Sequence, residues 1–251
     1  EQSNYDCLVF CIRNIKHIEI PNFIEHICSN SFNYCEQLES VEFSDDSKLQ
    51  TIDEFAFSET KIESIKIPSS TTLIGKYAFG FCKKLHRIEI PNNSKLQTIE
   101  KSAFCWSSIE SITIPSELVD LKNEWCSSAY NITKISVSPY NPKYRLYDEK
   151  MIIGKTKIEQ SNYDCLVFCI RNIKHIKIPN FIEHICSCSF AGCEQLESIE
   201  FSSDSILQTI GTNAFNGLKM KSFTIPSSVT SIGENAFQFC KFQQIEITNN
   251  S

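Results

Sequence analysis

The stretch Phe223–Cys240 reads FTIPSSVTSIGENAFQFC, and its pattern decides the fold of this chain. Phe223 and Ile225 are two residues apart, so they lie on one face of a β-strand, and Thr224 between them points to the other face. Pro226 ends the strand because proline has no N–H to give to a β-ladder. The residues that follow turn the chain back, and their Ile, Ala and Phe side chains are predicted to point inward.

The same pattern recurs about every 23 residues along most of the chain. One such repeat cannot bury its own apolar face, so neighbouring repeats must stack to form a continuous core. We expect ten strands in one parallel sheet, over residues 17–20, 40–43, 64–67, 87–90, 111–114, 134–137, 175–178, 198–201, 222–225 and 244–247. A buried column should contain Phe32, Phe57, Phe79, Phe104, Phe190, Phe215 and Phe237.

A longer duplication contains these repeats: residues 1–43 recur at 159–201 with 38 of 43 positions identical. Between the copies lies an insertion in which Met151–Ile153 and Leu166–Phe168 are apolar strand candidates around a polar stretch, which suits a β-hairpin. The chain is predicted to be a single domain over residues 1–251, with a partial hairpin arm (1–14), repeats one to six (15–137), the hairpin insertion (138–172) and repeats seven to ten, the last incomplete (173–251). Because the first copy begins inside the hairpin stretch, we expect a fragment of a longer protein.

The repeat L-x-x-I-x-I-P-x-x-V-x-x-I-G-x-x-A-F-x-x-C resembles the BspA-type leucine-rich repeat over nearly the whole chain. The sixth repeat and the insertion resemble the variant found in trichomonad surface proteins of that family. The resemblance implies a β-rich, right-handed leucine-rich-repeat solenoid that serves adhesion or protein binding and performs no catalysis. The fifth repeat departs from the pattern, since Trp125 and Cys126 stand where Ala and Phe are expected.

Composition and motifs exclude several functional classes. The 251 residues carry a net charge of −6, which argues against nucleic acid as a partner. No run approaches 18 apolar residues, so no membrane insertion is expected from this sequence. The sequence contains no H-E-x-x-H, no G-x-S-x-G and no P-loop. We therefore expect no enzymatic activity, no catalytic residues, no cofactor and no metal.

Cysteine is frequent, with thirteen in the chain. Cys35, Cys82, Cys193 and Cys240 occupy one repeat position, and we predict buried, reduced thiols there because free cysteine is among the most buried residues. Within each copy the two are separated by two repeats, roughly 9.6 Å at the strand spacing, which is too far for a disulfide. Cys105 and Cys126 lie in adjacent repeats and are therefore the best candidates for a disulfide.

Two surfaces are candidates for partner binding. The outward positions of the strands carry mixed charges and no aromatic residue, which fits a solvated face or a polar binding site. The insertion instead concentrates tyrosine, a residue enriched at interfaces, although its rings would be buried if the hairpin covered the solenoid. The predicted partner-binding residues are Tyr144, Tyr147 and Tyr163 of the insertion and Glu19, Glu42, Lys66, Glu89, Lys177 and Glu200 of the strands.

The function expected from these features is a cell-surface or extracellular adhesion module that binds host or matrix proteins, or other cells, through the solenoid surface. The alternative is a cytoplasmic protein-interaction scaffold, which unpaired cysteines favour because oxidising compartments usually pair them. The sequons at Asn92, Asn131 and Asn249 would carry glycans only in a secreted chain. The sequence leaves open the identity of the partner, the oligomeric state and the use of these sequons.

Overall fold

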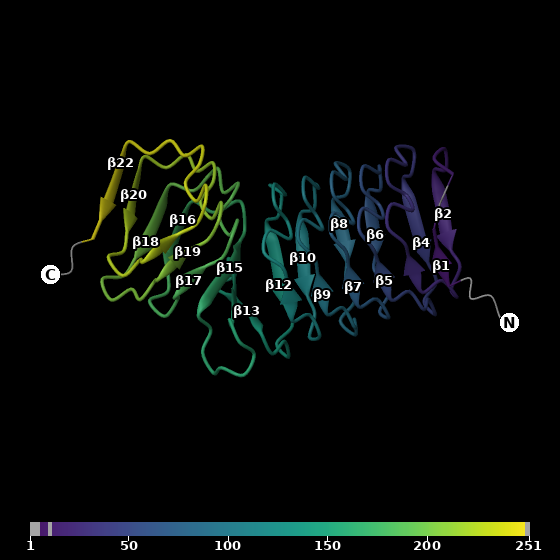
Figure 1. Ribbon diagram of the computed structural model, residues 1–251, viewed down its shortest axis with the longest axis horizontal. Helices are drawn as coiled ribbons and strands as arrows, with labels where there is room; N and C mark the ends of the chain where they lie inside the picture. Colours follow the sequence, from purple (N-terminus) through teal and green to yellow (C-terminus); the bar gives the residue numbers. More distant parts are fainter. Residues whose placement is uncertain (1–5, 10–11, 249–251) are drawn as a thin grey trace. The chain divides into compact units, whose positions relative to one another are not determined.

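The computed structural model describes residues 6–9 and 12–248, which form twenty-two β-strands and no helix (Figure 1). The chain divides into two compact units. The N-terminal unit contains Glu1–Ile132 and Ser136–Pro142, and the C-terminal unit contains Thr133–Ile135 and Lys143–Ser251. Each unit is a β-solenoid built of stacked repeats, so the predicted fold class is confirmed. That the whole chain forms a single domain stays a prediction.

The ten predicted strands are present at the expected positions. In the inner repeats the inward residues are more buried than the outward ones, as in the buried Ile65 and Ile67 on either side of the exposed Lys66, whereas β22 in the last repeat is exposed along its whole length. The strands are β2 (His17–Ile20), β4 (Ser40–Phe43), β6 (Ser64–Lys66), β8 (Arg87–Glu89), β10 (Ser111–Ile114), β12 (Lys134–Val137), β16 (His175–Ile178), β18 (Ser198–Phe201), β20 (Ser222–Ile225) and β22 (Gln244–Ile247).

The prediction that these ten strands form one sheet was wrong. They pair in parallel two by two, as β2–β4, β6–β8, β10–β12, β16–β18 and β20–β22. Proline weakens the ladder at three of the interruptions: the N–H of Thr248, just after β22, donates to Ile225 O at 2.9 Å, but Pro68, Pro115 and Pro226 follow β6, β10 and β20 and have no N–H for the preceding repeat. Pro91 has the same position after β8, where the β6–β8 ladder persists but is one residue pair shorter than β2–β4.

A second series of short parallel strands joins the repeats along another side of each solenoid. In the N-terminal unit it runs in the order β1–β3–β5–β7–β9–β11. These two-residue strands are β1 (Cys7–Leu8), β3 (His26–Ile27), β5 (Thr51–Ile52), β7 (Leu73–Ile74), β9 (Thr98–Ile99) and β11 (Asp120–Leu121). In β3, β5, β7 and β9 the second residue is a fully buried isoleucine. These strands were not predicted from the sequence.

In the C-terminal unit the corresponding sheet has the order β13–β14–β15–β17–β19–β21. Its strands are β13 (Tyr144–Tyr147), β14 (Met151–Gly154), β15 (Cys165–Cys169), β17 (His184–Ile185), β19 (Thr209–Ile210) and β21 (Ser231–Ile232). β14 pairs antiparallel with both β13 and β15, and β15 pairs parallel with β17. The insertion is thereby attached to the repeat sheet, and β13 is a strand that the sequence did not predict.

The phenylalanine column is present in both units. Phe57 stacks on Phe32 and Phe79, with ring centroids 4.9 and 5.4 Å apart, and Phe79 stacks on Phe104 at 5.6 Å. In the C-terminal unit Phe215 stacks on Phe190 at 5.1 Å and on Phe237 at 5.4 Å. All of these rings are fully buried except that of Phe237, which is half-buried in the last complete repeat.

The fifth repeat, which departs from the sequence pattern, still fills its place beside the column. Trp125 is 3% exposed and packs edge-on against Phe104, with centroids 6.2 Å apart. The larger indole thus replaces a stacked ring with an edge-to-face contact, an arrangement that aromatic pairs also favour.

Candidate functional site

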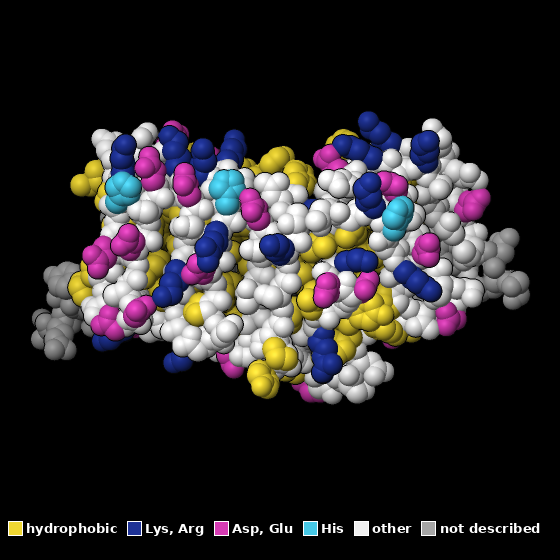
Figure 2. All heavy atoms as spheres, turned by 180° about the vertical axis from the view of Figure 1, so that it is seen from behind, with side chains coloured by type: hydrophobic (Ala, Val, Ile, Leu, Met, Phe, Trp, Pro, Cys, Tyr) yellow, Lys and Arg dark blue, Asp and Glu magenta, His cyan; other side chains and the backbone are white. Residues whose placement is uncertain are grey.

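The outward strand positions form a polar surface in each unit. Glu19, Glu42, Lys66 and Glu89 in the N-terminal unit and Lys177 and Glu200 in the C-terminal unit are all exposed. Figure 2 shows one face of the molecule, on which acidic and basic side chains are interspersed. The six charged residues named from the sequence are therefore accessible to a partner.

Pairing between strands brings these charges together differently in the two copies of the duplication. Glu19 lies opposite Glu42, whereas Lys177 lies opposite Glu200. Lys66 lies opposite Glu89 and forms an exposed ion pair with Asp45 at 3.0 Å. Like charges on directly opposite residues repel, so the duplicated faces have the same shape but a different charge pattern.

The three tyrosines predicted from the insertion have different environments. Tyr144 is 3% exposed, so its ring is not available on the surface. Tyr163 is half-buried and lies beneath two cations, Arg145 at 5.2 Å and Lys155 at 5.3 Å from the ring centroid. Tyr147 is 37% exposed at the end of β13 and is the most accessible of the three.

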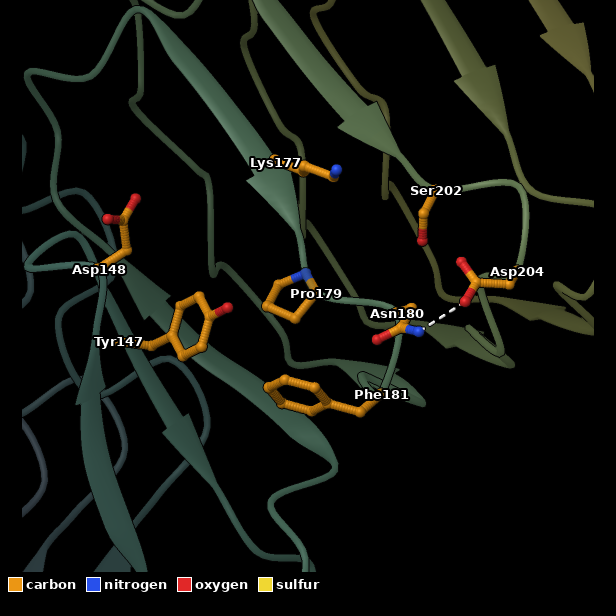
Figure 3. Close-up of a pocket in the computed structure, with 8 residues that line it drawn as sticks. All are labelled: Tyr147, Asp148, Lys177, Pro179, Asn180, Phe181, Ser202 and Asp204. Atoms are coloured by element: carbon orange, nitrogen blue, oxygen red, sulfur yellow. Dashed lines mark hydrogen bonds between the residues drawn. The ribbon is translucent and has the colours of Figure 1, made fainter.

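A cavity of about 670 Å³ lies beside Tyr147, entirely within the C-terminal unit. Figure 3 shows the rings of Tyr147, Pro179 and Phe181 close together at one side of the pocket. The two aromatic rings meet edge to face, with centroids 5.8 Å apart. The lining residues are Tyr147, Asp148, Lys177, Pro179, Asn180, Phe181, Ser202 and Asp204, which we call the hairpin pocket.

Local structure explains how this pocket forms. Asp148 and Glu149 have φ values of 50° and 54°, and Lys150 N donates to Tyr147 O at 3.1 Å, as in the tight turns that join antiparallel strands. This turn places Tyr147 and Asp148 beside the loop that follows β16. The insertion therefore supplies one wall of the pocket and the repeats supply the other.

Hydrogen bonds fix the acidic side of the pocket. Asn180 Nδ2 donates to Asp204 Oδ2 at 2.6 Å. The nearby Ser202 hydroxyl and the hydrogen bond from Asn180 lower the pKa of Asp204, which is therefore ionised at neutral pH. With Asp148 and Lys177 on the rim, the pocket presents two carboxylates, one ammonium and two exposed aromatic rings to a partner.

Two residues of the hairpin pocket, Tyr147 and Lys177, were predicted from the sequence. Phe181, which is 38% exposed, was not predicted. A signal for it was present, because this repeat and its duplicate have Phe two residues after the proline, where the other proline-containing repeats have Ser, Asn or Glu. An aromatic residue at a position that is otherwise polar indicates a local role.

The N-terminal copy contains the same loop without the insertion wall. Asn22 Nδ2 donates to Asp46 Oδ2 at 2.7 Å, and Phe23 is 53% exposed. The Asn–Asp contact is therefore a property of the repeat. Phe23 is a natural reference for Phe181, since the two occupy the same position in the duplication.

The cysteines depart from the prediction in one respect: Cys7 and Cys28 form a disulfide across adjacent repeats, with their Cα atoms 6.4 Å apart. Cys7 and Cys28 occupy different repeat positions, so the repeat pattern did not predict this pair. Cys82 and Cys193 are buried thiols, as expected, whereas Cys240 is only half-buried. Burial raises the pKa of the Cys82 thiol to about 11.

The described residues contain no group of His, Cys, Asp or Glu side chains arranged to hold a metal ion. Over the same ranges there is also no helix of the length and apolarity that crossing a bilayer requires.

Similar proteins support the same architecture. The pneumococcal vaccine antigen PcpA matches with a TM-score of 0.78 and 25% identity, over 94% of this chain and 62% of that one. A leucine-rich repeat protein from Eubacterium ventriosum matches with a TM-score of 0.73 and 23% identity, over 93% and 60%. A leucine rich cell surface protein from Faecalibacterium prausnitzii matches with a TM-score of 0.57 and 21% identity, over 94% and 79%. The chain thus spans about three fifths of the length of the first two.

No curated protein sequence matches this chain. Residues 5–137 and 156–251 match the family described as BspA type leucine rich repeat region, in six copies. This match agrees with the repeat period, the stacked phenylalanines and the solenoid neighbours. The chain belongs to the BspA-type leucine-rich repeat family.

Proposed function

We propose that this chain is a non-enzymatic recognition module on the cell surface, which binds a host or matrix protein through the hairpin pocket and the adjoining outward face of β16 and β18. The observation that carries the proposal is the contact between Tyr147 and Phe181, two partly exposed rings beside a cavity of about 670 Å³. Aromatic side chains in such positions contribute much of the binding energy at protein interfaces.

The charges around the rings support a protein partner. Lys177 and Asp204 lie on the same pocket, and Glu200 is the strand partner of Lys177. Charges of both signs near an aromatic centre favour a partner surface with complementary polar groups, which sets orientation and specificity. Tyr163 contributes by supporting the insertion and its cations, and the buried Tyr144 contributes by holding β13 in place.

A location outside the cell is supported by two features. The Cys7–Cys28 disulfide is typical of an oxidising environment. The 25% identical neighbour PcpA is a vaccine antigen. These features favour the surface module over the cytoplasmic scaffold. Surface biotinylation of intact cells distinguishes the two, since a cytoplasmic scaffold would remain unlabelled.

The binding surface is tested with purified chain on a panel of immobilised extracellular-matrix and host surface proteins. We expect the double variant Tyr147→Ala, Phe181→Ala to lose binding at least tenfold while its melting temperature changes little, because both rings are already partly in solvent. The matched control is Phe23→Ala, which removes the equivalent ring from the copy that lacks the insertion wall.

A second pair of variants tests the strand face. Glu42→Lys and Glu200→Lys reverse equivalent charges in the N-terminal and C-terminal units. A loss of binding with Glu200→Lys alone agrees with the proposed surface. Equal losses with Phe23→Ala and with Tyr147→Ala, Phe181→Ala would show that the hairpin pocket is not the specific binding site and contradict the proposal. A loss with Glu42→Lys alone would place the site in the N-terminal unit and contradict it as well.

A further inference from the structure

The duplication places a second pair of cysteines where the first copy has its disulfide. Cys165 and Cys186 each stand 158 residues after Cys7 and Cys28, the offset that relates residues 1–43 to 159–201. The sequence around the first cysteine, DCLVFCIR, is identical at 6–13 and 164–171. Of these two pairs, Cys7–Cys28 is bonded, whereas Cys165 and Cys186 are present as thiols.

The strand register around the two pairs is the same. Cys7 lies opposite His26 in β1–β3, and Cys165 lies opposite His184 in β15–β17. Cys28 follows His26 by two residues, and Cys186 follows His184 by two residues. In both pairs the first cysteine therefore lies at the start of one strand, and the second lies just after the end of the neighbouring strand. The backbone frame that brings Cys7 to Cys28 is therefore repeated in the C-terminal unit.

Hydrogen bonds next to the cysteines are also repeated. Cys28 N donates to Leu8 O at 3.0 Å, and Cys186 N donates to Leu166 O at 2.8 Å. The hydroxyl of Ser31 donates to the carbonyl of Cys28, and that of Ser189 donates to the carbonyl of Cys186, at 2.6 and 2.7 Å. These contacts fix the residue after the strand in both copies, so no backbone rearrangement separates the bonded pair from the thiol pair.

The two thiols are in contact. The Cys165 thiol donates a hydrogen bond to the Cys186 sulfur. Cys165 is 6% exposed and Cys186 is half-buried, so a reagent reaches the pair from the Cys186 side. Gly154 on the neighbouring strand has no side chain, and a Cβ there would lie 3.2 Å from the Cys165 sulfur, so glycine leaves room for the thiol.

We propose that Cys165 and Cys186 form the second disulfide of this chain, by exchange with a low-molecular-mass disulfide such as oxidised glutathione. The Cys186 thiolate attacks one glutathione sulfur, the glutathione S–S bond breaks, and one glutathione leaves as a thiolate. Cys165 then loses its proton and attacks the Cys186 sulfur of the mixed disulfide, which releases the second glutathione. Two protein thiols are oxidised and one glutathione disulfide is reduced to two thiols.

The electrostatics of the pair agree with these roles. The hydrogen bond from Cys165 lowers the pKa of Cys186, against the opposing effects of burial and of the nearby Asp164. The same hydrogen bond and burial raise the pKa of Cys165. Since the thiolate is the nucleophile in exchange, Cys186 reacts first and Cys165 resolves the mixed disulfide.

A neighbouring pair provides the alternative that the test must separate. Cys169 donates a hydrogen bond to Cys193, and both are buried. Burial acts to raise the pKa of Cys193, but the Cys169 hydrogen bond and the Arg171 guanidinium outweigh it and lower that pKa to about 7. Cys193 also lies near the Arg171 guanidinium, with Nη1 3.6 Å from its sulfur.

Chymotryptic mapping distinguishes the pairs. The purified full chain is equilibrated in a glutathione redox buffer, its free thiols are blocked with N-ethylmaleimide, and it is digested without reduction. Cleavage after Tyr163, Phe168, Phe181 and Phe190 places each of the four cysteines in a different peptide. Cys165 lies in peptide 164–168, Cys169 in 169–181, Cys186 in 182–190, and Cys193 in the peptide that begins at residue 191. We expect 164–168 linked to 182–190. Cys7–Cys28, in peptides 6–10 and 24–32, is the internal reference.

Variants complete the test. Cys188→Ser should keep the link, because Cys188 shares peptide 182–190 without being part of the pair, and Cys186→Ser should abolish it. Oxidation should raise the melting temperature by about 5–10 °C, and Cys165→Ser should remove that rise. The proposal is overturned if peptide 164–168 is recovered with Cys165 alkylated at a redox ratio at which peptides 6–10 and 24–32 are linked. It is also overturned if the only new link joins peptide 169–181 to the peptide that begins at residue 191.

Discussion

Truncation of Phe79 tests the stacked column that holds the N-terminal unit together. Its side chain is fully buried and its ring stacks on Phe57 and Phe104 at 5.4 and 5.6 Å. Phe→Ala at a buried site costs about 3–5 kcal/mol, and each aromatic pair contributes about 0.5–1.5 kcal/mol beyond its buried area. Two such pairs are lost, so we expect Phe79→Ala to lower the free energy of unfolding by about 4–5 kcal/mol.

Tryptophan fluorescence during urea unfolding measures this loss. Both tryptophans of the chain, Trp106 and Trp125, belong to the N-terminal unit, so their emission follows that unit. Trp125 packs against Phe104, one ring away from the mutated site. The change should appear as a lower urea midpoint in this signal.

Two controls separate burial from mere loss of an aromatic ring. Phe79→Leu keeps most of the volume and should cost about 1–1.5 kcal/mol. Tyr140→Ala removes a ring of the same unit that is 85% exposed, and it should change the free energy of unfolding by no more than about 0.5 kcal/mol. A cost below about 1 kcal/mol for Phe79→Ala, or equal costs for Phe79→Ala and Tyr140→Ala, would refute the stacked-column argument.

Three further predictions concern cysteine and glycine. Cys7→Ser opens a disulfide loop and should cost about 3 kcal/mol by urea unfolding, a difference that should vanish in reducing buffer. Gly75→Ala should cost about 1–3 kcal/mol, because a Cβ there would lie 2.6 Å from the backbone carbon of Asp53; an unchanged urea midpoint contradicts this. The raised pKa of Cys82, about 11 in the fold against an ordinary value of 9.0, favours the neutral thiol. The stabilisation that this raised pKa provides should be complete below pH 9 and should decline as the pH rises towards 11. Cys82→Ala should remove this decline from the pH–stability profile.

The strands that carry the outward charges followed from the sequence because their signal is local. In each, two apolar residues two positions apart precede a proline or a polar residue, and the period of the repeat then sets the next strand. The phenylalanine column followed for the same reason, since equal positions in stacked repeats must lie above one another. Burial of Phe79 and Phe215 confirms both steps.

The second sheet did not follow, because each of its strands has only two residues. Ile52 or Ile74 alone gives no alternation from which a strand can be recognised, and hydrogen bonds to the neighbouring repeats create the ladder. The tight corners were equally unpredicted: Phe55 and Tyr77 adopt φ values of 56° and 53°, and Phe55 N donates to Lys76 O of the next repeat at 2.9 Å. Stacking stabilises a conformation that an isolated repeat would avoid.

The sequence by itself determined the repeat, the inward and outward faces of its strands, and the family resemblance, because these depend on residues close together in the chain. Only the tertiary structure decided which distant residues meet. Cys7 reaches Cys28 through the pairing of β1 with β3, and Tyr147 reaches Phe181 through the turn between β13 and β14. Such contacts depend on strand register and turn conformation, which are set by the packing of whole repeats.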